Sequence, residues 1–170
     1  MLPREVDDAQ YDDIRSAARR ALTVLGMRTG ITHLEWFRRS DGSIAISEVA
    51  ARPPGAQITQ LMSYAHDFDT VQAWARVMIF GEFEPPERKY AAGAAFLRGQ
   101  GEGRIVAVHG VDEVNRELGS LIVAAKAPAI GATPSTGYEG DGWVIVRHPD
   151  TATVERAVLK LVSTIRVEVA

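Results

Sequence analysis

Two glutamates on either side of a tight turn are the residues of this chain whose type and spacing point to chemistry. Glu35 and Glu48 flank the sequence Ser40-Asp41-Gly42, which is typical of a β-hairpin turn. If Asp41-Gly42 forms a two-residue turn, antiparallel pairing sets Glu35 directly opposite Glu48, with Cβ atoms about 4.5–5.5 Å apart. Facing carboxylates repel each other, and a divalent cation would relieve that repulsion.

The register of this hairpin leaves alternatives open. A three-residue loop with a bulge at Gly42 would change the register and move the two glutamates apart. On the two-residue register, the face that carries the glutamates is otherwise apolar or aromatic, with Phe37, Ile44, Ile46 and Ala50. Two glutamates on a half-exposed hairpin can also simply face water, as charged strand residues usually do.

Two further side chains are expected beside the glutamates. Arg52 lies four residues after Glu48, on the same side if the strand continues, and its planar fork suits phosphate or carboxylate. His33 lies two residues before Glu35, where it could orient a metal or contact a substrate. Magnesium is typically held by one or two carboxylates together with substrate phosphates. Beside the alternative that both glutamates face water, the hairpin thus offers a magnesium–nucleotide site, in which the metal would neutralise charge during phosphoryl transfer.

Helices and strands with clear sequence patterns must position these residues. Helical spacing of apolar side chains predicts helices at residues 7–25, 58–62, 69–78 and 150–165. Strand patterns are found at residues 31–37, 44–51, 91–97, 104–108, 121–125 and 143–146. Gly99, Gly101 and Gly103 lack the spacing of a phosphate-binding loop and predict a hairpin turn between the strands on either side.

A proline-rich, charged segment divides the chain. Residues 82–89 have the composition of a linker, so we predict domains at residues 1–84 and 91–170 with a linker at 85–90. The chain has 170 residues, of which 46% are hydrophobic and 24% charged, and this predicts a globular protein with a buried core.

Composition also excludes several classes of function. A net charge of −3 gives no reason to expect nucleic acid as a partner. The absence of cysteine excludes disulfides and thiolate metal sites, so a metal here must take oxygen or imidazole ligands. No apolar run reaches the roughly 20 residues that cross a bilayer and no signal peptide is present, so we expect a cytoplasmic protein without a membrane partner.

The hairpin resembles the metal-binding end of ATP-grasp enzymes. Their pattern is a Glu on one strand, a short turn, Glu-x-Asn-x-Arg on the next strand and a Gly-containing loop. The matching residues are Glu35, Glu48 and Arg52, followed by Pro53-Pro54-Gly55. The sequence at residues 48–55 looks most like the branch with biotin carboxylase-like and amino-acid ligase proteins. Ala50 replaces the Asn of the pattern, so we expect one Mg²⁺ rather than two.

The resemblance covers the whole chain in order and implies a fold class. The fold is expected to be α+β, with the C-terminal part of an ATP-grasp domain, made of an antiparallel hairpin plus helices. A small β-rich domain like the biotin carboxylase C-terminal domain follows. The nucleotide cleft of the family also needs an earlier subdomain, for which the residues before position 31 have no room. We therefore expect a fragment that lacks its N-terminal part and is inactive alone.

The function implied by the resemblance is that of a carboxylate ligase dependent on ATP and Mg²⁺ (or Mn²⁺). ATP would phosphorylate a small-molecule carboxylate, and an amine-type acceptor would attack the acyl phosphate. Glu35 and Glu48 would hold the metal and thereby the nucleotide, and Arg52 would act in catalysis. The implied substrate-contacting residues are His33, Gly55 and Gln57. The alternative is a non-catalytic ATP-grasp-derived scaffold or dimerisation module. In that case the partner would be a second copy of the chain, in a homodimer.

Overall fold

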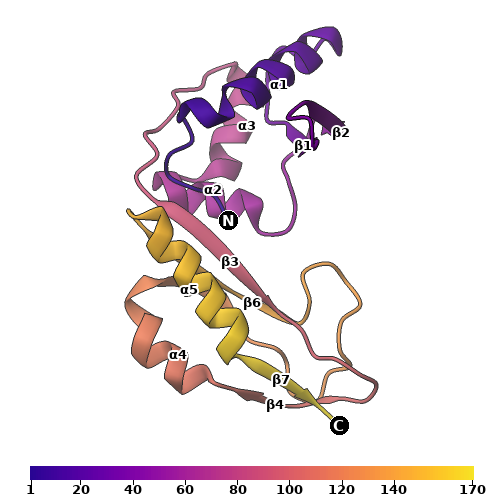
Figure 1. Cartoon of the computed structure of the whole chain (residues 1–170), viewed down its shortest axis with the longest axis vertical. Helices are drawn as coiled ribbons and strands as arrows, with labels where there is room; N and C mark the ends of the chain where they lie inside the picture. Colours follow the sequence, from indigo (N-terminus) through magenta and orange to yellow (C-terminus); the bar gives the residue numbers. More distant parts are fainter. The chain divides into compact units, whose positions relative to one another are not determined.

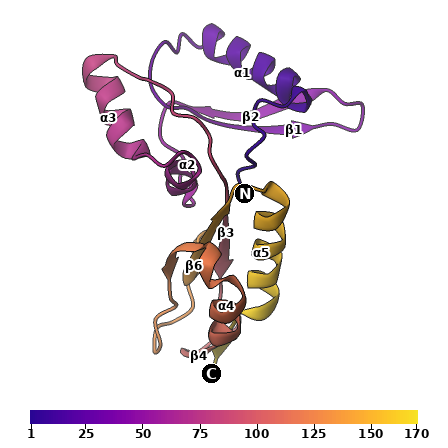
Figure 2. The same ribbon diagram turned by 90° about the vertical axis from the view of Figure 1, so that its left-hand side faces the viewer.

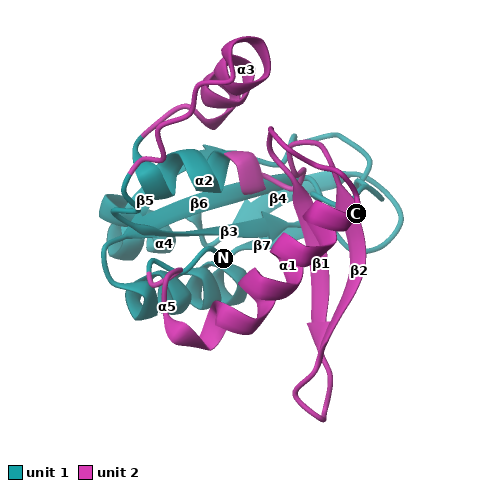
Figure 3. Cartoon of the chain, turned by 90° about the horizontal axis from the view of Figure 1, so that it is seen from above, with its two compact units in different colours: residues 1–4, 60–67, 87–170 teal, residues 5–59, 68–86 magenta.

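The computed structural model describes all 170 residues and divides into two compact units. Unit 1 comprises Met1–Arg4, Gln60–Asp67 and Glu87–Ala170, and unit 2 comprises Glu5–Thr59 and Phe68–Pro86 (Figures 1 and 3). The chain therefore passes between the units several times, and only its last passage falls within the predicted linker. None of the helices is long and apolar enough to span a bilayer.

Unit 2 contains one antiparallel hairpin and the helices around it. Its elements are the 3-10 helix η1 (Ala9–Tyr11), α1 (Asp12–Val24), β1 (His33–Arg38), β2 (Ile44–Ala50), the first residues of α2 (Ile58–His66), and α3 (Thr70–Phe80). Asp8 caps η1 by accepting a hydrogen bond from the backbone N–H of Gln10 at 2.9 Å. Asp69 caps α3 in the same way, and Gly81 ends it with a left-handed φ of 71°.

One face of the hairpin packs against α1. Ile44 and Ile46 of β2 line an open groove together with apolar side chains of α1, and Figure 2 shows α1 lying along the hairpin. Arg38 of β1 donates two hydrogen bonds to Asp13 of α1, at 2.5 and 3.1 Å, and its guanidinium lies 5.8 Å from the centre of the Trp36 ring. Helix α1 thus fixes this face of the hairpin and leaves the opposite face to solvent.

The ion pair between Asp13 and Arg38 should make unit 2 sensitive to acid. The hydrogen bond from Arg38 lowers the pKa of Asp13 below its ordinary value of 3.8. A carboxyl group whose pKa is depressed by folding contributes stability above its unfolded pKa and loses that contribution as the pH falls through its folded pKa. We expect the free energy of unfolding to fall more steeply below about pH 4 in the wild type than in Asp13→Asn.

Urea unfolding followed by circular dichroism at a series of pH values measures this difference. Asp7→Asn is the matched control, because the Asp7 side chain makes no ion pair. Identical pH profiles for the wild type and Asp13→Asn would show that the ion pair does not hold α1 on the hairpin.

Unit 1 contains a three-stranded antiparallel sheet, a separate pair of strands and the helices that cover them. Its elements are most of α2, then β3 (Ala91–Leu97), β4 (Ile105–His109), α4 (Val111–Leu118), the 3-10 helix η2 (Gly119–Leu121), β5 (Ile122–Lys126), β6 (Gly142–His148), α5 (Thr151–Thr164) and β7 (Arg166–Val169). The sheet has the order β3-β6-β5, and β4 pairs with β7.

The sheet of unit 1 is covered on both faces. Helices α5 and α4 pack on one face over a core that includes Val146, Val154 and Leu161, and Figure 1 shows α5 running alongside β3. On the other face, Leu61 and Ala65 of α2 pack against Ile145 and its neighbours. A strand covered on both faces needs small or apolar residues throughout, which explains the sequence of β3.

The hairpin turn predicted around Gly101 is wrong. Strands β3 and β4 do not pair with each other, because β3 pairs with β6 and β4 pairs with the C-terminal strand β7. Gly103 is needed for another reason: a Cβ atom there would lie 2.5 Å from the carbonyl oxygen of Ala170, and the neighbouring Arg104 exchanges backbone hydrogen bonds with Ala170. Helix α4 and strand β7 were not predicted at all.

Candidate active site

The hairpin of unit 2 places Glu35 directly opposite Glu48, as the sequence predicts. The pairing is nevertheless not continuous along the hairpin. Trp36 pairs with Ile46, whereas its neighbour Glu35 pairs with Glu48. Ser47 therefore has no partner on β1 and forms a β-bulge in β2.

The turn of this hairpin differs from the predicted one. Arg39 and Ser43 close the loop, with the N–H of Arg39 donating to the carbonyl of Ser43 at 2.9 Å, and Gly42 has a left-handed φ of 83°. The loop thus has three residues, 40–42, and the two-residue turn is wrong. The longer loop shifts the register by one residue, and the bulge at Ser47 shifts it back, so the two glutamates still face each other.

The three-residue loop and the bulge at Ser47 change which side chains share a face with the glutamates. Paired residues lie on the same face of a sheet, and consecutive residues of a regular strand lie on opposite faces. Ile46 pairs with Trp36 and therefore lies opposite to the face of Glu35, so the prediction that Ile44 and Ile46 share that face is wrong. Both isoleucines instead face α1. Ala50 keeps the predicted face, because it pairs with His33.

Each glutamate has one basic neighbour. His33 Nε2 lies 3.2 Å from Glu35 Oε1, and Arg52 Nη2 lies 3.3 Å from Glu48 Oε1. The glutamate side chains are 54% and 44% exposed, respectively. The second oxygen of each carboxylate, Oε2, accepts no hydrogen bond from the protein. Four of the residues singled out from sequence thus form two acid–base pairs, with the two glutamates facing each other between His33 and Arg52.

The loop after β2 holds the remaining predicted residues in an unusual backbone conformation. Ala56 and Gln57 have positive φ values of 51° and 59°, in the left-handed region that costs a non-glycine residue about 1–3 kcal/mol. Gly55 is exposed and does not have a positive φ, so it is not the residue that makes this turn. Two hydrogen bonds fix the loop to α2, from Ile58 N to the Gly55 carbonyl and from Thr59 Oγ1 to the Pro54 carbonyl.

The donor atoms on this face fit a hard divalent cation that also binds another ligand. No group of three or more His, Asp or Glu side chains gathers anywhere in the protein to hold a metal by itself. The face of Glu35 and Glu48 offers two carboxylates with an open oxygen each, which is the partial set that Mg²⁺ uses when phosphate oxygens and water supply the rest. Ala50 adds no oxygen on this face.

Comparisons with known proteins identify the fold. No protein-family model and no curated protein matches the sequence. Among solved structures, an L-amino acid ligase from Bacillus licheniformis is similar, with 20% identity and a TM-score of 0.77 over 94% of this chain and 41% of that chain. An N5-carboxyaminoimidazole ribonucleotide synthetase from Thermotoga maritima has 19% identity and a TM-score of 0.70 over 96% of this chain and 44% of that chain.

A biotin carboxylase domain of a single-chain bacterial carboxylase is also similar, with 17% identity and a TM-score of 0.59 over 98% of this chain and 39% of that chain. The chain therefore spans about two fifths of the length of the structures it matches. Identities this low establish the fold alone, and the likeness extends over nearly the whole chain. The 170 residues have the fold of a part of the ATP-grasp ligases.

Proposed function

We propose that this chain is part of an ATP-dependent carboxylate ligase in which Glu35 and Glu48 hold the Mg²⁺ (or Mn²⁺) ion of the bound nucleotide. The observation that carries the proposal is the direct opposition of the two glutamates on an exposed hairpin face. Like charges in that arrangement destabilise a sheet unless a cation lies between them. The ATP-grasp fold of the chain supplies a context in which such a cation has a role.

The reaction proposed for the complete protein has two steps. The γ-phosphate of ATP is transferred to a substrate carboxylate, giving an acyl phosphate and ADP. The nitrogen of an amine then attacks the acyl carbon, and inorganic phosphate leaves as the amide bond forms. When bound, the metal would be held by Glu35 and Glu48 and would neutralise charge that develops on the transferred phosphate.

The residues around the glutamates have proposed roles in this reaction. Arg52 is the catalytic residue: its side chain is 55% exposed beside Glu48, and its guanidinium can turn to a phosphate or acyl-phosphate oxygen. His33, whose Nε2 lies 3.2 Å from Glu35 Oε1, would hold that carboxylate in place and contact the substrate. Gly55 and Gln57 belong to the strained loop that follows β2, and their proposed role is to contact the carboxylate or amine substrate.

The complete ligase is proposed to be longer than these 170 residues. The chain spans about two fifths of the similar solved ligases, and its described residues contain no glycine-rich phosphate loop. We therefore assign binding of the adenine and most phosphate contacts to an N-terminal part of a longer polypeptide. The 170 residues alone are expected to have no ligase activity.

Metal-dependent nucleotide binding tests the proposal. Calorimetric titration of ADP into the longer polypeptide should show binding that requires Mg²⁺, and Glu35→Gln or Glu48→Gln should weaken it by about 10- to 100-fold, because one carboxylate ligand is lost. Glu102→Gln is the matched control, since Glu102 is an exposed glutamate in a turn of unit 1. ADP binding that is equally strong without Mg²⁺, or unchanged in both variants, would reject the metal site.

Ala50 favours a second candidate function. It stands opposite His33 on the glutamate face, at the position where the ATP-grasp pattern has an oxygen ligand. A protein that no longer bound a nucleotide would tolerate this loss, and the hairpin would then serve as a scaffold for dimerisation. The same titration separates the two functions, because a scaffold would bind no Mg²⁺–ADP in the longer polypeptide.

A further inference from the structure

Helix α3 of unit 2 is apolar on almost all sides. Arg76 is its only charged residue. Four of its large apolar side chains are more than half exposed, namely Val71 (56%), Met78 (58%), Ile79 (71%) and Phe80 (64%). A surface helix normally keeps one polar face, whereas a helix that is hydrophobic all round is normally enclosed by protein. The composition of α3 is therefore that of an enclosed helix.

Unit 2 lacks a core that could account for these side chains. Apart from Pro54 in a loop, Ile14 is its only buried apolar residue, and both hydrophobic core clusters of the chain lie in unit 1. Its only sheet is the two-stranded hairpin, and an isolated two-stranded sheet is marginally stable in water. Unit 2 therefore has the elements of a folded domain without the apolar partner surface that would complete it.

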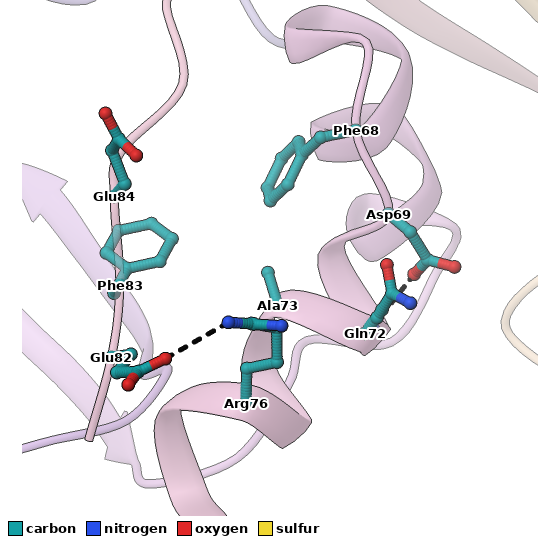
Figure 4. Close-up of a pocket in the computed structure, with 8 residues that line it drawn as sticks. All are labelled: Phe68, Asp69, Gln72, Ala73, Arg76, Glu82, Phe83 and Glu84. Atoms are coloured by element: carbon teal, nitrogen blue, oxygen red, sulfur yellow. Dashed lines mark hydrogen bonds and ion pairs between the residues drawn. The ribbon is translucent and has the colours of Figure 1, made fainter. Parts of the chain in front are cut away.

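A cavity beside α3 indicates the chemistry of that partner surface. It measures about 580 Å³, and its lining includes Phe68 and Phe83, Arg76, and the carboxylates of Asp69, Glu82 and Glu84. Figure 4 shows the rings of Phe68 and Phe83 on opposite sides of this cavity, and Arg76 below them reaching Glu82 at 3.1 Å. Glu84 has no ion-pair partner. The walls thus suit an apolar side chain, and the excess of carboxylates suits a cation beside it.

We infer that the exposed side of α3 and this cavity form the docking surface for another part of the same longer polypeptide, which contributes apolar side chains and a Lys or Arg facing Glu84. The inference rests on the proposed function for the existence of that polypeptide. The length of the similar ligases, more than twice that of this chain, supports an intramolecular cover over a separate partner.

Cysteine labelling tests this inference, because the chain contains no natural cysteine. Ile79→Cys places a thiol on the exposed side of α3, and Leu159→Cys places one at a 61% exposed position of α5 in unit 1. We expect both thiols to react with a maleimide at similar rates in the 170-residue chain. In the longer polypeptide the thiol of Ile79→Cys should react at least about tenfold more slowly than in the 170-residue chain. The labelling rate of Leu159→Cys should be the same in both.

Three outcomes would overturn the inference. Equal labelling of position 79 in the short and the long polypeptide would show that no other segment covers α3. Protection of position 79 in the 170-residue chain that increases with protein concentration would show that the cover is a second copy. Glu84→Lys in the longer polypeptide should restore labelling at position 79, and Glu102→Lys should not; no effect of Glu84→Lys would reject the cationic contact.

The labelling result is independent of the proposed chemistry. Mg²⁺–ADP binding is measured on the same longer polypeptide. Protection of position 79 without nucleotide binding would support the docking surface and reject the ligase. Nucleotide binding without protection would reject the docking surface alone.

Discussion

Replacing Glu48 by Gln in the longer polypeptide is expected to lower kcat/KM for ligation by about 10²- to 10³-fold, because a metal that bridges phosphate oxygens contributes several kcal/mol to the transition state. Glutamine keeps the shape of the side chain and removes its charge. The hairpin should therefore stay folded while the affinity of its face for a divalent cation falls.

A double variant distinguishes a shared metal from two independent roles. If Glu35 and Glu48 hold the same ion, either substitution alone displaces it, and Glu35→Gln/Glu48→Gln should be little worse than the more damaging single variant. Steady-state assays of ADP release across a range of Mg²⁺ concentrations measure this, with Glu102→Gln as the control. Fully additive losses would show that the two carboxylates act on different groups.

The second large effect is expected at Gly110, between β4 and α4. Gly110 has a φ of 84°, and a Cβ atom there would lie 2.3 Å from the carbonyl oxygen of Thr164. An alanine would combine the cost of a left-handed backbone with a clash against backbone that cannot rotate away. We expect Gly110→Ala to lower the free energy of unfolding by about 2–4 kcal/mol.

Gly119→Ala is the matched control for this substitution. Gly119 has a helical φ of −53°, and nothing lies within 4 Å of an added Cβ atom. Alanine there should be neutral or stabilising by less than about 1 kcal/mol, because it restricts the unfolded chain. Denaturant unfolding of both variants compares the two sites, and equal stabilities would show that the β4–α4 junction relaxes easily.

Much of the secondary structure could be predicted because periodic patterns and capping residues are local. Asp150 caps α5 as predicted, by accepting a hydrogen bond from the Thr153 N–H. Strand pairing is different, because it depends on residues far apart in the sequence. The glycines near position 101 have the composition of a hairpin turn, yet the partner of β4 is the C-terminal strand β7, and no local pattern indicates this.

In the candidate site, too, local sequence patterns did not indicate the details of strand pairing. The opposition of Glu35 and Glu48 was predicted correctly from an incorrect turn, because the error at the loop and the unrecognised bulge at Ser47 cancel. The packing of α1 on Ile46 supplies the missing information. Ile46 and its partner Trp36 face α1. In a regular strand Glu48, two residues after Ile46, would face α1 as well. The extra residue of the bulge instead places Glu48 on the opposite face, where it pairs with Glu35.

Because unit 1 is made of three separate stretches of sequence, recombination between related genes can preserve it only with certain breakpoints. A single genetic crossover within codons 85–90 would transfer β3 to β7 without Gln60–Asp67. Leu61 and Ala65 would then be replaced by residues from another parent, although they cover the face of the sheet that contains Ile145. Natural recombination between distant relatives should therefore exchange both units together, and breakpoints between codons 60 and 90 should be rare among functional descendants.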